Sequence, residues 1–125
     1  MSYKSTPRSP YGLNEIAIKT DRGVEFDAMA GITRQLKLQL ENDGADFPAL
    51  CACVHRNRQL WTILAADVAV EDNALPKDIR SSIFFLSEFI AQHSRKVLKK
   101  IAGIDVLIDI NLAIMRGLAE SGPNR

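Results

Sequence analysis

The 125-residue sequence is poor in several features, and each scarcity excludes a class of protein. Its two cysteines, Cys51 and Cys53, lie only two positions apart, so they cannot build a disulfide framework. No uncharged stretch reaches ten residues, which excludes a transmembrane helix. The first residues, MSYKSTPRSPYG, have no apolar core and are therefore not a secretory signal peptide. We expect a soluble protein of the reducing cytoplasm that does not contact a membrane.

Excess charge of one sign and strand signals are also lacking. The 16 Lys and Arg residues are balanced by 15 Asp and Glu residues, which leaves a formal net charge of +1. The whole chain thus has no field that would steer it toward nucleic acid or an anionic membrane. No segment sustains the apolar–polar alternation of a strand, whereas helical spacing recurs along the chain. We predict an all-α protein.

The chain divides into a leader, one helical domain and a tail. Residues 1–12 carry Ser, Pro, Arg and Gly with little to bury, which predicts a disordered leader. Residues 13–120 are predicted to form a single domain, a compact helical bundle of four principal helices with short connections. Leu13–Lys19 adds a short N-terminal helix to this prediction. Residues 121–125 are predicted to be a loose tail.

Capping residues and apolar spacing locate the four helices. Thr20 and Asp21 are N-cap types before the first helix, and Gly44 is the candidate C′ residue that ends it. Asp46 can cap the second helix, and Pro76 lies near the N1 position of the third. The residues expected to face inward are, helix by helix, Phe26, Met29, Thr33, Leu36 and Leu40; Leu50, Val54, Trp61, Leu64 and Val68; Ile79, Ile83, Leu86, Ile90, Val97 and Ile101; and Ile104, Leu107, Ile108, Ile114, Met115 and Leu118.

Three metal-capable side chains, Cys51, Cys53 and His55, occur within five residues. Residues two apart on a helix point about 200° away from each other, so the two thiolates could not easily hold one ion. A zinc site commonly takes four ligands from two separated pairs, and the sequence has no second cluster. We therefore interpret the cysteines as small core residues and predict no metal site.

No motif of the sequence identifies an enzyme. It lacks a dinucleotide-binding glycine pattern, a phosphate-binding loop, a zinc-protease motif and a nucleophile elbow. His93 lies on an apolar helix stripe, where a histidine is usually partly buried and hydrogen-bonded. Asp105 and Asp109 share a helix face, which is more typical of a solvated surface than of a cation site. We predict no catalytic residues and no cofactor.

One basic cluster stands out from the balanced charge. It consists of Arg95, Lys96, Lys99 and Lys100, which helical spacing gathers on one side. Such a cluster could contact RNA phosphates. The simpler alternative is a solvated helix end, where cations complement the helix dipole. No aromatic residues are interleaved with these cations to stack on bases, which favours the simpler alternative.

Five residues are candidates for contacts with a protein partner. Phe85 and Phe89 form a second apolar edge on the third principal helix, which places that helix centrally in a bundle or in a partner interface. Trp61 and Leu64 could contribute to the same surface, although a tryptophan is more often a core residue than a binding hot spot. Asn111 lies three residues from each of two inward-facing isoleucines, so its amide either fixes the bundle register or bonds a ligand helix.

Three stretches of the sequence together resemble a known family. The first is RQLWTILAAD at 58–67, and the second is NALP at 73–76 followed by IRSSI at 79–83. The third is LIDIN at 107–111, continued by Ile114 and Gly117. In this order and spacing they resemble the flagellar biosynthesis regulatory FlaF family over about residues 20–119. Gly23 stands where family members often have a proline, and residues 1–12 have no counterpart in the resemblance.

The resemblance implies a non-catalytic helical protein that promotes flagellin synthesis and secretion. Family members act post-transcriptionally and in opposition to a partner called FlbT, so flagellin and an FlbT-type regulator are the expected partners. The leading hypothesis is chaperone-like binding of an amphipathic flagellin helix in an apolar groove. The alternative is an RNA-binding regulator of flagellin mRNA translation that uses the basic cluster. A third hypothesis is a homodimer in which the edge of Phe85 and Phe89 meets only itself.

Overall fold

Four helices make up the computed structural model, which describes residues 22–70 and 75–120. They are α2 (Arg22–Glu41), α3 (Phe47–Val68), α4 (Lys77–Leu98) and α5 (Asp105–Glu120). No strand occurs in the described ranges, so the all-α prediction of four principal helices is confirmed. The predictions for the leader 1–12, the short helix 13–19, the caps at 20 and 21 and the tail 121–125 fall outside the described residues.

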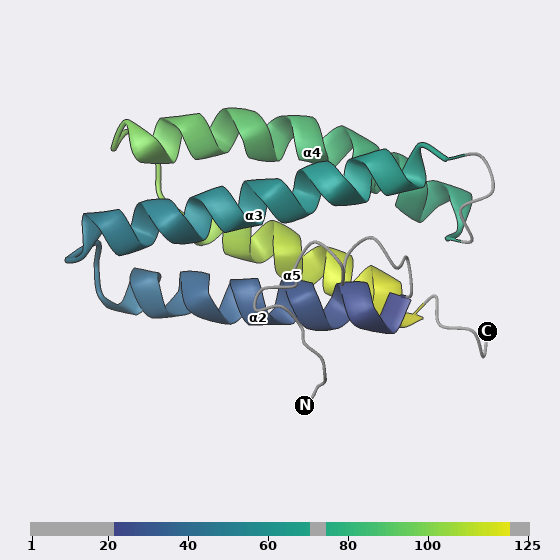
Figure 1. Ribbon diagram of the computed structural model, residues 1–125, viewed down its shortest axis with the longest axis horizontal. Coiled ribbons are helices and arrows are strands. Elements are labelled where there is room, and N and C mark those ends of the chain that lie inside the picture. Colours follow the sequence, from purple (N-terminus) through teal and green to yellow (C-terminus); the bar gives the residue numbers. More distant parts are fainter. Residues whose placement is uncertain (1–21, 71–74, 121–125) are drawn as a thin grey trace.

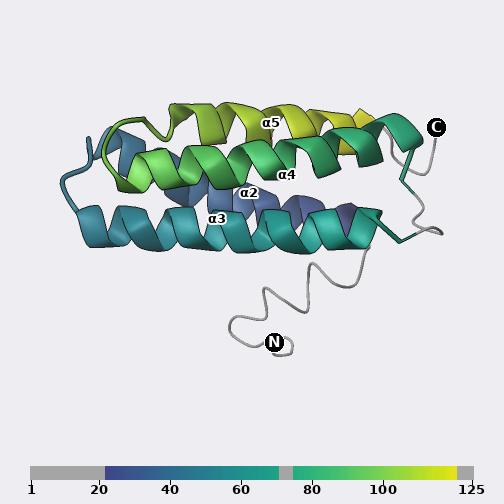
Figure 2. The same cartoon turned by 90° about the horizontal axis from the view of Figure 1, so that it is seen from above.

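Each helix runs antiparallel to the one before it, as in an up-and-down bundle (Figure 1). In the described parts of the chain, α3 packs on α2 and α4, and α5 packs on the same two helices, whereas the diagonal pairs α2/α4 and α3/α5 have no Cα atoms within 8 Å of each other. The view from above shows the four helices with their long axes aligned (Figure 2). The first half of α3 therefore lies beside the second half of α4. None of the described helices has both the length and the apolarity needed to cross a membrane.

Local sequence signals explain where α3 and α4 begin. The Asp46 carboxylate accepts a hydrogen bond from the Ala49 backbone N–H at 3.1 Å, and Pro48 lies in the first turn, which confirms the predicted cap. Pro76 is itself the N-cap residue of α4, one position before the N1 site that the sequence indicated. Its carbonyl accepts the first helical hydrogen bond, from the Arg80 N–H at 3.0 Å.

α2 and α4 each end in a turn that contains a residue with positive φ, and this turn stops the helix. After α2, Asp43 has φ 56° and Gly44 has φ 73°, so Asp43 takes the C′ position predicted for Gly44. After α4, Lys100 has φ 64°, and the Ile101 N–H bonds back to the Lys96 carbonyl at 3.0 Å. This turn takes Ile101 out of the helix and leaves it 70% exposed, so the prediction that it faces inward is wrong.

One continuous core fills the space between the four helices. The predicted inward stripes are confirmed for most residues, and the fully buried positions include Met29, Leu36, Trp61 and Ile83. Leu40 is 46% exposed, because α2 ends one residue later and its last turn extends past the core. Among the residues that the structure describes, the buried apolar set is Ala28, Met29, Ile32, Leu36, Leu50, Cys53, Val54, Leu60, Trp61, Leu64, Val68, Leu75, Ile83, Ile90, Val97, Ile104, Leu107, Ile108, Ile114, Met115 and Leu118.

Candidate functional site

A buried hydrogen-bonded cluster joins three helices at the centre of the bundle. The Asn111 carbonyl oxygen on α5 accepts a hydrogen bond from the Trp61 indole N–H of α3 at 2.8 Å. The Asn111 amide nitrogen donates to the Thr33 hydroxyl of α2 at 3.0 Å and to the Asn57 carbonyl oxygen of α3 at 2.8 Å. Asn111 and Asn57 are both fully buried. The interior of the bundle therefore supplies all three partners of the Asn111 amide.

This cluster supports the interpretation that the Asn111 amide fixes the register of the bundle. Because its hydrogen bonds are already satisfied inside the bundle, its amide is not available to a ligand helix unless the core opens. It ties α5 to α2 and α3 at one register instead. Asn57 interrupts the apolar stripe of its helix in the sequence, and in the structure it is a member of the cluster. Its own amide nitrogen is buried without a partner, as is the Ser94 hydroxyl.

Trp61 and Leu64 are core residues, at 0% and 1% exposure. This corrects the prediction that they help to line an exposed partner groove. The physical reason is that α3 is covered by α2 and by α4, so the stripe that carries both residues faces the interior. The structure joins Trp61 to Asn111, and it separates both from the remaining partner candidates on α4.

Exposed aromatic rings on the solvent side of α4 form an apolar surface, which we name the aromatic face. It consists of Phe85, Phe84 and Phe89, whose side chains are 75%, 59% and 40% exposed. The sequence indicated Phe85 and Phe89 as an edge four residues apart, and the structure adds Phe84. Large apolar side chains left in water at this density are typical of binding surfaces.

An open groove continues the aromatic face toward the end of α3. It is lined by Val68, Ala69, Lys77, Arg80, Ser81, Ser82, Phe84 and Phe85. The Arg80 guanidinium forms one wall and is fixed there, because it donates to the Val68 carbonyl at 3.0 and 3.2 Å and to the Val70 carbonyl at 3.0 Å. These carbonyls belong to the end of α3, where helical hydrogen bonds run out. Arg80 thus joins α3 to α4 and shapes the groove.

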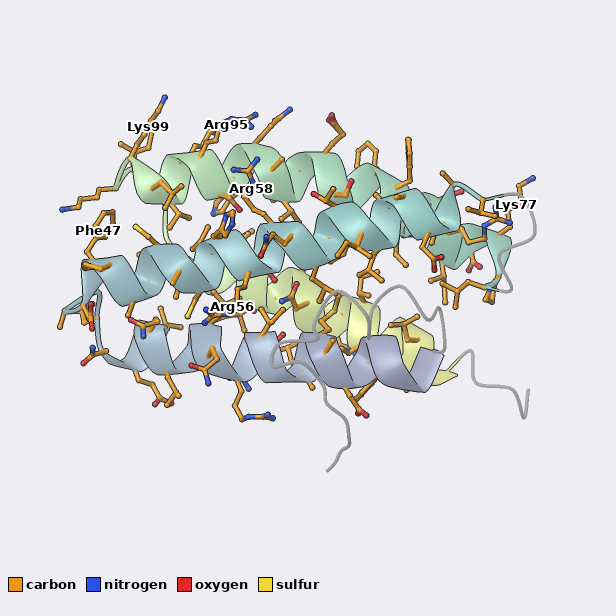
Figure 3. The ribbon with its side chains drawn as sticks, in the orientation of Figure 1. Phe47, Arg56, Arg58, Lys77, Arg95 and Lys99 are labelled. Atoms are coloured by element: carbon orange, nitrogen blue, oxygen red, sulfur yellow. The ribbon has the colours of Figure 1, made fainter. Side chains whose placement is uncertain are left out.

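The predicted basic cluster lies at the opposite end of α4. Arg95, Lys96, Lys99 and Lys100 are all exposed, and Figure 3 shows Arg95 and Lys99 projecting away from the bundle. The Lys100 ammonium lies 4.5 Å from the centre of the Phe47 ring, a cation–π contact between α4 and the start of α3. Arg95 and Lys96 lie in the last turn of α4, whereas Lys99 and Lys100 lie in the turn that follows the helix.

His93 lies between the aromatic face and the basic cluster. Its ring stacks on Phe89 with 5.5 Å between the ring centres, and its Nε2 lies 2.8 Å from the Gly103 carbonyl oxygen. It is half-buried, which agrees with the predicted role as a hydrogen-bonded residue on the stripe. Through these contacts His93 fixes the Phe89 ring and holds the loop before α5 against α4.

The side chains of Cys51, Cys53 and His55 differ in how deeply they are buried. Cys53 is buried, and that burial raises the pKa of its thiol, although the nearby Arg56 guanidinium opposes the rise. Cys51 is half-buried and His55 is exposed, so the three side chains do not share one environment. Within the described residues, no group of three or more His, Cys, Asp or Glu side chains is placed to hold a metal ion.

Comparison with known proteins adds a family to this geometry. The chain matches the family described as flagellar protein FlaF over residues 8–118. The match begins within the leader, which the resemblance noted from the sequence did not include. No curated protein and no solved structure gives a significant match. Because the family match covers nearly the whole chain, this four-helix protein belongs to the flagellar protein FlaF family.

Proposed function

We propose that this protein is a non-catalytic factor of flagellum biogenesis that binds flagellin and thereby promotes its synthesis and secretion. The family match supports a flagellar role, and the aromatic face of α4 is the observation that supports protein binding. Three phenylalanine rings held on a well-packed helix form a preorganised surface. An amphipathic helix of flagellin would cover them with apolar residues at i, i+3, i+4 and i+7.

The aromatic face has the energetic capacity for such binding. Burying one phenylalanine side chain contributes about 1.5–3 kcal/mol, and binding energy usually concentrates in a few large residues near the centre of an interface. The lining of the adjoining groove combines the hydroxyls of Ser81 and Ser82 with apolar side chains such as Val68 and Phe84. This combination of an apolar centre and a polar rim is the usual anatomy of a protein interface.

The test measures binding of purified monomeric flagellin by calorimetry and size exclusion, with and without an FlbT-type regulator. We expect a complex with the native chain, and a loss of affinity of at least about tenfold for F85D/F89D, because a buried carboxylate costs more than the lost ring contacts. L38D is the matched control, since Leu38 is 53% exposed on α2, away from α4. No complex with the native chain, in either condition, would overturn direct recognition.

The second candidate is an RNA-binding regulator of flagellin translation, which the exposed cluster of Arg95, Lys96, Lys99 and Lys100 favours. Phosphate contacts by these residues predict an affinity for the flagellin leader transcript that falls steeply with salt. K99E/K100E is then expected to weaken RNA binding at low salt. If this variant leaves both RNA affinity and motility unchanged, the RNA function is excluded.

A further inference from the structure

The solvent side of α4 carries one continuous exposed line, which we name the α4 stripe. It consists of Phe85, Phe89, Gln92, Lys96 and Lys99, all of which are exposed. Their spacing of 4, 3, 4 and 3 residues places them along one face of a helix. The stripe changes character along its length, because its first half is aromatic and its second half is cationic.

The cationic half has no acidic counterpart close by in the sequence. Neither residues 47–66 nor residues 89–104 contain an Asp or a Glu. These two segments lie side by side, as the contact between Lys100 and Phe47 and the antiparallel packing of α3 on α4 show. In Figure 3, Arg58 lies between α3 and α4 in this region. These two segments therefore carry cations and no acids, and Asp46 and Asp105 lie at their borders, although the net charge of the whole chain is +1.

We propose that the α4 stripe is a two-part docking surface for an acidic amphipathic helix of a protein partner. The apolar residues of that helix cover Phe85 and Phe89, and its carboxylates pair with Lys96 and Lys99. Lys96 lies eleven positions after Phe85, which sets the two parts of the partner about 16 Å apart at 1.5 Å per residue. The inference rests on the proposed role of α4 in protein binding and adds the chemistry of the segment that it binds.

Charge complementarity selects this partner over nucleic acid. Proteins that bind single-stranded RNA combine a basic groove with aromatic rings on which successive bases stack. On α4, the rings and the cations are instead separated into two halves of a convex helix, and Glu88 lies beside the aromatic half, where it would repel phosphates. A protein helix with separate apolar and acidic segments matches both halves at once.

The two halves have different energetic roles. Exposed ion pairs contribute about 0–1 kcal/mol each, so the cations alone cannot hold a partner. Complementary charge chiefly accelerates association, disfavours wrong partners and fixes orientation. We therefore assign affinity to the aromatic half and the direction of the bound helix to the cationic half. Salt should weaken the cationic contribution, because the Debye length falls to about 3 Å at 1 M.

The test uses a display library of helical 20-residue peptides, selected on the full-length chain at low salt and counter-selected on F85D/F89D. We expect enriched peptides to carry large apolar residues at i and i+4, with at least three carboxylates centred about eleven positions away. For a representative peptide, K96E/K99E should reduce affinity about tenfold at low salt and less at high salt. R34E/K37E is the matched control, because it makes the same charge change on exposed positions of α2.

The outcomes separate this inference from the proposed function. Enriched peptides without carboxylates, or unchanged binding by K96E/K99E, would overturn the two-part surface even if flagellin binds. Failure of flagellin to bind, with acidic peptides still selected through α4, would overturn the proposed function and leave the two-part surface supported. If K96E/K99E loses affinity for a 20-nucleotide single-stranded RNA while peptide binding is unchanged, the cationic half belongs to nucleic acid. Circular dichroism of each variant confirms that it folds.

Discussion

Asn111 shows how one buried polar residue determines the packing of several helices. It receives the Trp61 indole N–H and donates to Thr33 and Asn57, so one side chain contacts two other helices. Such a residue adds little net stability when it is satisfied, but a partner left unpaired in the core costs about 1–3 kcal/mol. Rotating or sliding α5 would unpair several groups at once. The cluster thus favours the one register of α5 that pairs these groups over other registers that would bury the apolar residues but leave these groups unpaired.

Two alanine variants separate the hydrogen bonds of this cluster from simple cavity formation. Asn111→Ala and Asn57→Ala remove the same atoms from equally buried sites, so their cavity costs are similar. Asn111→Ala should lower the free energy of unfolding by about 2–4 kcal/mol, because it takes a hydrogen-bond partner from three buried groups, on Trp61, Thr33 and Asn57. Asn57→Ala should cost at least about 1 kcal/mol less, because the Asn57 amide nitrogen is already unpaired. Urea unfolding followed by circular dichroism measures both. Equal losses would show that the hydrogen bonds contribute nothing beyond packing.

The sequence predicts part of this cluster. Asn111 lies three residues from buried isoleucines on both sides, so its inward direction follows from helical spacing. Asn57 was missed because an asparagine among apolar residues is as consistent with a break in the stripe as with a buried amide. Its partner Asn111 lies 54 residues away on another helix. The spacing of residues within one helix carries no information about which other helix a given side chain faces.

The helix ends show how local backbone chemistry sets the length of an element. At the end of α2, the Gly44 N–H reaches back to the Gln39 carbonyl, and Asp43 and Gly44 both have positive φ. At the end of α4, a lysine takes the same conformation. The sequence predicted the first end to within one residue because glycine marks such turns. It missed the second, because lysine at positive φ has no sequence signature, and Ile101 was therefore placed in the helix.

A pair of glycine substitutions tests this description of α2. Gly31 lies within the helix, where an added methyl group would meet only the Arg34 guanidinium at 3.8 Å. Gly31→Ala should therefore raise the free energy of unfolding by about 0.5–1 kcal/mol, through the higher helix propensity of alanine. Gly44 has open space around it but a φ of +73°. Gly44→Ala should lower the free energy of unfolding by about 1–2 kcal/mol, because L-residues are strained there. Thermal denaturation compares the two, and the same sign of change for both would contradict this assignment.

For the whole molecule, amphipathic spacing was sufficient to predict the bundle but not its surfaces. A helix with apolar residues on two sides must bury one of them, and spacing does not say which. Both α3 and α4 have neighbours on two sides. Trp61 and Leu64 lie on the buried stripe of α3, whereas Phe85 and Phe89 lie off the buried stripe of α4 and remain in water. The predicted groove therefore divides into an interior cluster and an exposed face on α4. That division depends on the packing of all four helices.

The exposed aromatic face also bears on the oligomeric state. Stable interfaces bury about 1,200–2,000 Å² in total, and self-pairing through one helix face with three rings lies at the low end of that range. The four cations of the basic cluster would contribute little to such a contact, because only Asp78 and Glu88 supply carboxylates along α4. We therefore expect a monomer at about 10 μM by light scattering, with the mass unchanged by Phe89→Asp. A dimer that Phe89→Asp converts to a monomer would instead show that the aromatic face meets itself. In that case the homodimer hypothesis would replace the partner surface, because one face cannot hold both occupants at the same time.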